Sequence, residues 1–216
     1  MAVTARRPAS LDRASILVAA LELVDEVGLD GLNMRALALR LGVGTMSLYH
    51  WLPNKDALLD GIVEALLLAI EIPAADAGAW AEKAAMMARS LRSVALQHPN
   101  AVPLMVTRPF ATGDALRPCN AAFDVLAEGG LTHEQALIAF RAIVAYVFGF
   151  VMMETAGFFG AAGYGRDPDE LRALGLPRLA EIAPHLAGRD ISADFDAGLR
   201  ILELGALGFL AEADRP

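Results

Sequence analysis

The sequence predicts an all-α protein in which a small N-terminal helix-turn-helix domain precedes a larger helical domain. Its 216 residues are 56% hydrophobic, and apolar residues recur at intervals of three and four along most of the chain, which is the period of an amphipathic helix. Stretches with the strict alternation of a β-strand are nearly absent. Two short helical segments, one on either side of Gly42, indicate that the N-terminal domain is a helix-turn-helix.

The first two helices are marked by their ends. We expect Ser10 to cap a helix over residues 11 to about 27, which ends at Gly28. Asn33 is expected to cap a short second helix, because its side chain can accept a hydrogen bond from a free backbone N–H of the first turn. Gly42 ends this helix, since glycine enters the left-handed region at no steric cost.

A third short helix is expected to begin near Thr45, with Leu48 and Leu52 four residues apart on a buried face. Met46, Ser47 and His50 then project outward, flanked by Thr45, Tyr49 and Trp51. Two short helices joined by a glycine turn, the second with a polar and aromatic outer face, form a helix-turn-helix that binds DNA. The alternative is a plain helical hairpin inside a core.

A fourth helix is predicted from Lys55 to about residue 70, capped by Asn54. A lysine at a helix start opposes the helix dipole, and a DNA phosphate there would relieve the conflict. The alternative is an exposed lysine without a role. We therefore assign residues 1–54 to a DNA-binding domain, residues 55–70 to a connecting helix, and residues 71–216 to a second, larger helical domain.

The net charge of −8 does not exclude a nucleic-acid partner, because the charge is unevenly placed. Residues 1–60 carry 6 basic and 7 acidic residues, so the excess of acid lies in the remainder. The single cysteine, Cys119, excludes an internal disulfide framework and fits a reducing compartment. The most apolar run, residues 142–153, is shorter than the ~20 residues of a bilayer crossing. We expect a soluble, cytoplasmic protein with no membrane partner.

The second half is predicted to contain further helices over residues 80–97, 101–106, 115–127, 133–159, 167–183 and 194–211. Thr132 and Gln135 form a capping-box pattern before the longest of them. That helix is apolar nearly all round, so we expect it to be buried on every face. Ser192 is the predicted cap of the last helix.

Small residues repeat in the two longest C-terminal helices: Ala142, Ala145 and Gly149 in one, and Gly198, Gly205, Ala206 and Gly208 in the other. Glycine inside a helix costs about 0.5–1 kcal/mol against alanine, and close helix approach is the usual compensation. One such face could serve an intrachain neighbour. Two long apolar helices are hard to cover with the short ones available, so we predict a two-fold homodimer with a four-helix interface.

The segment Asn33–Ala38, the turn Gly42–Gly44, the pair Leu48–Tyr49 and the segment Asn54–Leu59 resemble the DNA-binding domain of the TetR family of transcriptional regulators. The tyrosine and the lysine that opens the fourth helix are its most specific marks. The second half resembles the ligand-binding domain of the tetracycline-repressor subgroup. That likeness rests on the Thr107–Pro109 triplet, the segment Leu131–Ala136, and the run Tyr146–Phe150 that leads to Glu154.

The resemblance implies which residues meet operator DNA. Arg35 and Tyr49 match positions that contact phosphates or the groove, and Lys55 matches a phosphate contact. The recognition helix supplies Thr45, Met46, Ser47 and Trp51. His50 precedes Trp51, whereas the tetracycline repressor has these two residue types in the opposite order, so which of them reaches a base stays open.

The resemblance also implies a small-molecule pocket. The tetracycline repressor holds a drug–magnesium complex through a histidine shortly before the Thr-Arg-Pro triplet, and Leu104 stands at that place here. We therefore expect no metal, no metal-bound drug and no cofactor. An apolar wall with few polar groups is what a ligand pocket requires. The expected ligand-binding residues are Met87, Leu91, Leu104, Met105, Thr107, Arg108, Asn120, Phe123, Phe140, Val144 and Phe148.

Catalysis finds little support in the sequence. No histidine is placed to activate Cys119, and His98, His133 and His185 fall at helix boundaries. Neither a metal-ligand spacing such as HExxH nor a glycine-rich phosphate loop after a strand occurs. We predict a repressor that a small apolar ligand releases from its operator. The alternative is a helical carrier of hydrophobic small molecules that does not bind DNA.

Overall fold

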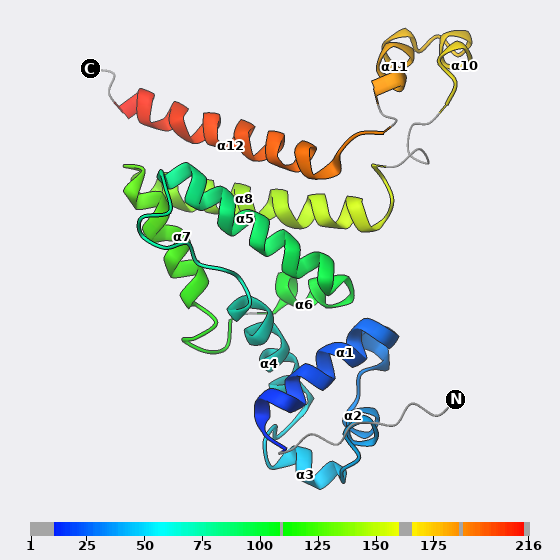
Figure 1. The fold of residues 1–216 in the computed structure, drawn as a ribbon, viewed down its shortest axis with the longest axis vertical. Coiled ribbons are helices and arrows are strands. Elements are labelled where there is room, and N and C mark those ends of the chain that lie inside the picture. Colours follow the sequence, from blue (N-terminus) through cyan, green and yellow to red (C-terminus); the bar gives the residue numbers. More distant parts are fainter. Residues whose placement is uncertain (1–10, 109, 160–165, 186–187, 214–216) are drawn as a thin grey trace. The chain divides into compact units, whose positions relative to one another are not determined.

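The computed structural model describes residues 11–108, 110–159, 166–185 and 188–213, and all regular structure in these ranges is helical (Figure 1). In chain order the helices are α1 (Arg13–Gly31), α2 (Met34–Leu41), α3 (Thr45–Tyr49), α4 (Lys55–Leu68), α5 (Trp80–Gln97), η1 (Pro99–Ala101), α6 (Val102–Thr107), α7 (Arg117–Glu128), α8 (His133–Thr155), α10 (Pro168–Ala173), α11 (Pro177–Ile182), η2 (Ala183–His185) and α12 (Ile191–Ala213). The all-α prediction is confirmed.

The chain divides into two compact units. Unit 1 comprises residues 1–74 and 93–122, and unit 2 comprises residues 75–92 and 123–216. The segment that carries η1 and α6 therefore belongs to unit 1, because it contacts the N-terminal helices. It does so although it follows residue 71, where the sequence predicts the domain boundary. Helices α5 and α7 each contribute residues to both units.

The caps of unit 1 agree with the sequence at α2 and α4 and differ at α1. The amide of Ala36 donates to the Asn33 side chain at 2.9 Å, and the amide of Ala57 donates to Asn54 at 2.8 Å. Gly42 ends α2 in the left-handed region with φ 67°. The cap of α1 is Asp12, which forms a capping box with Ser15; the predicted cap, Ser10, lies outside the described residues.

Gly28 breaks α1, as predicted, although one further helical turn follows. Its φ of 74° and ψ of 175° are not helical, and the turn beyond it extends to Gly31. A kink at glycine is expected because only glycine adopts this conformation without strain. The break redirects the chain toward α2, which packs against α1.

The core of unit 1 joins α1, α2, α3 and α4. Ile16, Leu37, Leu48 and Leu58 are each 0% exposed. At Gly61 the backbone of α4 approaches α1 so closely that a Cβ atom would lie 2.6 Å from a methyl carbon of Leu17. Burial of these side chains holds the short helices α2 and α3, which would be unstable alone because helix nucleation is costly.

In unit 2, α12 lies along α8 (Figure 1). The capping box of Thr132 and Gln135 at the start of α8 is confirmed. Further along, the Tyr146 hydroxyl donates to the carbonyl of Phe195 at 2.9 Å, and the two rings stack with centroids 5.3 Å apart. A Cβ on Gly198 would lie 2.0 Å from the Tyr146 oxygen. This glycine therefore serves a contact within the chain, the alternative that the sequence left open.

A salt bridge with aromatic walls joins α5 to α8 and α12. The Arg92 guanidinium donates to both carboxylate oxygens of Glu154, at 2.9 and 2.7 Å. It also lies over the rings of Phe150 and Phe195, at 5.6 and 4.9 Å from their centroids. Only 13% of the Arg92 side chain and 17% of the Glu154 side chain are exposed, so the pair is largely removed from water.

The C-terminal segment differs from the prediction in two places. The single helix expected over residues 167–183 is two short helices, α10 and α11, separated by Gly175 with φ 74°. The last helix is capped by Asp190, whose carboxylate accepts from the amides of Ser192 and Ala193 at 2.9 and 3.3 Å. Ser192, the predicted cap, is already inside α12.

The expectation that the longest helix is buried on every face is wrong for the single chain. The helix ends at Thr155, and its most apolar window has a mean hydropathy of 2.1 but is only 28% buried. By length and composition alone, α8 is able to cross a membrane. Its exposed apolar residues are Leu137, Ile138, Met152 and Met153. A face of α8 thus stays uncovered by the part of the chain that the structure describes.

Candidate functional site

The outer face of α3 is exposed, as the sequence predicts. Leu48 is 0% and Leu52 2% exposed, whereas Met46 is 78%, Tyr49 42% and Trp51 41% exposed. Ser47 and His50 are exposed as well, and Thr45 is partly buried. The helix itself is only five residues long and ends at Tyr49, so His50 and Trp51 follow it rather than form its last turn.

His50 and Trp51 contact each other edge to face. Their ring centroids are 5.6 Å apart with an interplanar angle of 85°. The two exposed rings therefore occupy one patch of the surface beyond α3. That one of these two rings reaches a base stays a prediction.

Cations flank this face on α2 and α4. Lys55 is exposed as the first residue of α4, and Arg35 is exposed in the first turn of α2. Arg40 is different, because its guanidinium donates to Glu22 at 2.9 Å and to Glu26 at 2.7 Å on α1. These bonds raise the pKa of Arg40 above its ordinary value. Arg40 thus connects α2 to α1, whereas the side chains of Arg35 and Lys55 are exposed to solvent.

The segment η1–α6 is fastened to α1 at its start. The Nδ1 atom of His98 lies 2.8 Å from a carboxylate oxygen of Asp25. The amide of Asn100 donates to the carbonyls of Val24 and Asp25, at 3.2 and 3.1 Å. The other carboxylate oxygen of Asp25 is buried and has no hydrogen-bond partner among the described residues, so the position of this carboxylate depends on His98.

The same segment is fastened to α4 at its end. Arg108, the C-cap of α6, donates through Nε to Asp60 at 2.8 Å and through a terminal nitrogen to Asp56 at 3.2 Å. The bond with Asp60, ahead of that with Asp56, raises the pKa of the guanidinium above its ordinary value. Asp56 is in the first turn of α4, next to Lys55. The group predicted as a ligand anchor is therefore engaged by two carboxylates of the connecting helix.

The expected ligand-binding residues are distributed over both units. Those in unit 2 are Met87, Leu91, Phe123, Phe140, Val144 and Phe148, and those in unit 1 are Leu104, Met105, Thr107, Arg108 and Asn120. Met87, Leu91, Leu104 and Met105 are buried, and Asn120 is exposed. The rings of Phe123 and Phe140 pack with centroids 4.8 Å apart. The Thr107 hydroxyl donates to the carbonyl of Pro103 in its own helix, at 2.6 Å.

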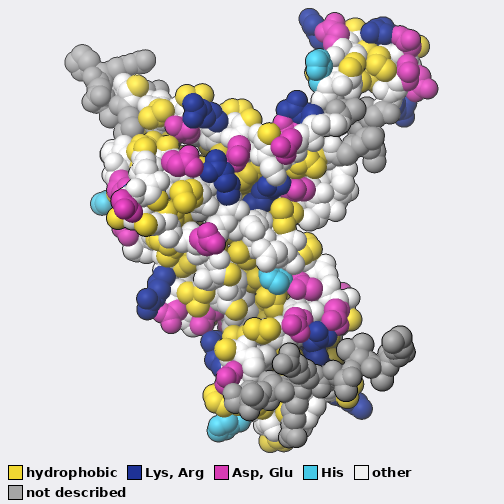
Figure 2. Space-filling model, viewed as in Figure 1, with side chains coloured by type: hydrophobic (Ala, Val, Ile, Leu, Met, Phe, Trp, Pro, Cys, Tyr) yellow, Lys and Arg dark blue, Asp and Glu magenta, His cyan; other side chains and the backbone are white. Residues whose placement is uncertain are grey.

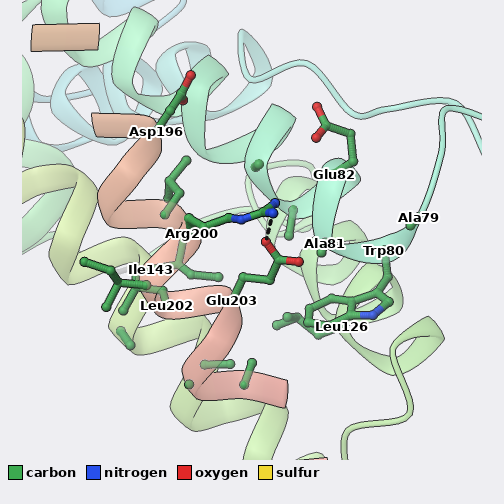
Figure 3. Close-up of a pocket in the computed structure, with 18 of the residues that line it drawn as sticks. Ala79, Trp80, Ala81, Glu82, Leu126, Ile143, Asp196, Arg200, Leu202 and Glu203 are labelled. Carbon is green, nitrogen blue, oxygen red and sulfur yellow. Dashed lines mark ion pairs between the residues drawn. The ribbon is translucent and has the colours of Figure 1, made fainter. Parts of the chain in front are cut away.

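Unit 2 also contains a pocket that these residues do not line. It measures about 530 Å³ and lies between the N-terminal half of α5, α8 and α12 (Figure 3). Most of its lining consists of small and aliphatic residues, among them Ala84, Ala139, Ala142, Ile143 and Leu199. This volume and apolar lining are typical of small-molecule sites.

Charged residues give this pocket one polar side. Arg89 bridges Glu82 at 3.0 Å and Asp196 at 2.8 Å, and Figure 3 shows the ion pair of Arg200 and Glu203 on α12 directed across the opening. Over the face of unit 2 in Figure 2, acidic and basic side chains are likewise interspersed with hydrophobic ones. Only a weak signal in the sequence marks this pocket, namely a spacing of alanines on two helices far apart in the chain.

Other reactive groups do not form a centre. Among the described residues, no cluster of three or more His, Cys, Asp or Glu side chains is placed to hold a metal ion. Cys119 is half-buried, and burial raises the pKa of its thiol. A thiol held protonated is a poor nucleophile. Lys83 is 4% exposed and pairs with Glu128 at 2.8 Å, so its ammonium is engaged in an ion pair.

Comparison with protein families finds two matches that together span most of the chain. Residues 16–62 match the bacterial regulatory proteins of the tetR family. Residues 72–205 match the tetracyclin repressor-like C-terminal domain. The first match contains α2, α3 and most of α1 and α4, and the second contains α5 to α11 and most of α12.

Individual proteins give the same result. An HTH-type transcriptional regulator of Saccharopolyspora erythraea is 33% identical over 90% of this chain and 84% of its own length. The class A tetracycline repressor of Escherichia coli is 34% identical over 87% of each chain. The crystal structure of apo ActR from Streptomyces coelicolor superposes with a TM-score of 0.81 and 31% identity, over 95% of this chain and 99% of that one.

Proposed function

Because the chain belongs to the TetR family of bacterial regulatory proteins, we propose that it is a homodimeric repressor that leaves its operator when a small, largely apolar ligand binds. Its relatives are transcriptional regulators, and the chain is a ligand-responsive DNA-binding regulator of the same kind. Its site of action is the bacterial cytoplasm. One observation carries the DNA-binding role, namely the exposed outer face of α3 over a buried Leu48 and Leu52.

In this proposal α3 enters the major groove while the flanking helices hold the backbone. The outer face from Thr45 to Trp51 meets base edges, and Lys55 at the start of α4 contacts a phosphate together with Arg35 and Tyr49. Lys55 sits where helix N–H groups and an ammonium favour an anion. Arg108 pairs with Asp56 and Asp60, so its positive charge compensates the negative charge of two carboxylates close to the contact of Lys55 with phosphate.

Dimerisation through α8 and α12 is supported by what each chain leaves uncovered. The exposed apolar residues of α12 are Ile201, Leu204 and Leu207, and those of α8 include Leu137 and Ile138. Gly149, Gly205 and Gly208 have open space where a Cβ would stand. Apolar side chains between glycines make a surface that another helix can approach closely. A two-fold pair of such surfaces gives a four-helix interface.

The dimer is tested by placing charge in this surface. Ile201→Asp, at a residue 70% exposed in one chain, should convert the dimer to a folded monomer in analytical ultracentrifugation. The matched control is Val106→Asp, also exposed but on α6, which should leave the dimer intact. A wild-type protein that sediments as a monomer at micromolar concentration refutes the proposed assembly.

For the ligand, two sets of residues are candidates. The predicted set around Met87, Met105 and Phe140 is supported by the family resemblance, and the pocket of α5, α8 and α12 is supported by its volume and lining. ActR, a structural relative, has been crystallised with actinorhodin, so an aromatic molecule of comparable size is a suitable first probe. Because Leu104 replaces the histidine, we propose that magnesium does not enter the complex.

A calorimetric comparison separates the candidates. Met105→Ala changes a residue of the predicted set that belongs to unit 1 and does not line the pocket, and Ala142→Trp fills the pocket. The site in use is the one whose variant abolishes binding of actinorhodin or of a tetracycline. Adding Mg²⁺ should leave the affinity for either compound unchanged, and a magnesium-dependent tetracycline complex would contradict the absence of a metal.

The segment η1–α6 is the proposed link between ligand and DNA. It is fastened to α1 through His98 and Asn100 and to α4 through Arg108. A shift of this segment must therefore move α1 or α4, and with them the angle at which α3 meets the groove. Two recognition helices one duplex turn, about 34–36 Å, apart tolerate little change in spacing, so release of the operator follows.

The regulator is tested by reciprocity. If ligand lowers operator affinity by some factor, operator DNA must lower ligand affinity by the same factor. Ligand affinity that saturating operator leaves unchanged contradicts the mechanism. The alternative, a helical carrier, predicts only weak binding that falls equally for every DNA sequence as salt rises.

A further inference from the structure

The face that α3 presents to DNA lacks the side chains that usually identify purines. Between Gly44 and Pro53 there is no Arg, Lys, Asn, Gln, Asp or Glu. Bidentate contacts to guanine come from Arg or Lys, and those to adenine from Asn or Gln. Arg40 on α2 is not available either, because Glu22 and Glu26 hold its guanidinium. Base selection by α3 must therefore rest on single hydrogen bonds and on apolar contacts.

Met46 is the residue of this face best placed for an apolar contact. It is the second residue of α3 and 78% exposed, and the first turn of a recognition helix is the part that meets base edges. A thioether donates no hydrogen bond and accepts only weakly. Met46 is also unbranched and adaptable, so it can follow an irregular surface. Its exposure in the free protein leaves apolar area that a partner can bury.

The major groove offers one apolar group, the C5-methyl of thymine. From this chemistry we infer that Met46 reads a thymine methyl in each operator half-site, and that thymine at this position is selected by its methyl group. The inference rests on the proposed function, since it requires α3 to enter the major groove. It adds to that function a specific base and the atom by which the base is recognised.

Deoxyuridine provides the test, because it differs from thymidine only by lacking the methyl. An operator is first selected with the full-length protein from a random duplex pool, and each thymine of one half-site is then replaced by deoxyuridine. Removing one methyl from a buried contact removes about 0.8 kcal/mol, which is a factor of about four in Kd. We expect one position per half-site to show this loss, and about sixteenfold when both half-sites are altered.

Variants of Met46 connect the sensitive base to the residue. Met46→Ala should bind the thymine operator less tightly and should no longer distinguish thymine from deoxyuridine at that position. Met46→Leu keeps an apolar contact and should keep the distinction. Leu174→Ala, a change at an exposed apolar residue that ends α10, should retain the full wild-type pattern.

Two outcomes overturn the inference. In one, no deoxyuridine replacement changes the Kd of the wild-type protein by more than experimental error. In the other, the sensitive thymine stays equally sensitive in Met46→Ala, so that another residue reads it. Failure to select any sequence from the pool would instead refute the proposed DNA-binding function, and the two failures are thus distinguishable.

Discussion

The ion pair of Arg92 and Glu154 allows a sharp test of how the helical domain is held together. Arg92→Met removes the guanidinium but keeps the length and apolar stem of the side chain. The carboxylate of Glu154, 17% exposed, then loses its two hydrogen bonds at 2.9 and 2.7 Å. Isolating one member of a buried pair costs about 3–5 kcal/mol. Since both side chains keep some exposure, we expect about 3 kcal/mol, the lower end of that range.

The double variant Arg92→Met with Glu154→Met gives the decisive comparison. When both charges are removed, no charged group is left buried without a partner. The rings of Phe150 and Phe195 still have an apolar side chain to pack against. Replacing a buried pair by apolar residues is often neutral, so the double variant should lose less than about 1 kcal/mol. The single variant is then less stable than the double.

Urea unfolding followed by far-UV circular dichroism, at fixed protein concentration, gives these free energies. A double-mutant cycle should yield a coupling of about 2 kcal/mol or more between the two residues. The reasoning is refuted if Arg92→Met alone costs less than about 1 kcal/mol, or if the cost of the double variant equals the sum of the singles.

The other predictions concern single sites. Gly198→Ala should lower stability by about 1–2 kcal/mol, because the clash with the Tyr146 oxygen outweighs the ~1 kcal/mol gain in helix propensity; unchanged urea unfolding would contradict this. Arg108→Ala should lower operator affinity in anisotropy titrations, because Asp56 and Asp60 lose their counter-charge beside Lys55, and it should weaken release by an inducing compound, since α6 is no longer held to Asp60; undiminished release would contradict the coupling. Cys119 should react with iodoacetamide more slowly than free cysteine at pH 8, and the rate should keep rising above the ordinary thiol pKa, because burial raises the pKa of this thiol; reaction at the free-cysteine rate would contradict it.

The helix-turn-helix could be predicted from the sequence because its signals are local. Asn33, Gly42 and Asn54 each fix a helix end through their own backbone or side chain, and the spacing of Leu48 and Leu52 alone decides which face of α3 is buried. Where two capping residues are close together the sequence is ambiguous. Asp190, rather than Ser192, is the cap of α12.

The features that sequence reasoning missed depend on contacts between distant segments. Apolar composition does not reveal what covers each face of α8, so a helix expected to be buried on every face is only partly buried by the described residues. The role of Arg108 could not be seen either, because its partners Asp56 and Asp60 lie about fifty residues earlier. The pocket is assembled from α5, α8 and α12 with Leu126 of α7, and small residues such as Ala142 carry no distinctive signal alone.

Recognition of a particular DNA sequence by the outer face of α3 can be measured by fluorescence anisotropy with a duplex selected from a random pool and a scrambled duplex of equal length, at several salt concentrations. We expect the selected duplex to bind at least a thousandfold more tightly, and we expect Ser47→Ala to reduce this ratio more than it reduces binding to the scrambled duplex. Equal binding to both duplexes, falling in parallel as salt rises, would mean that α3 does not recognise a sequence.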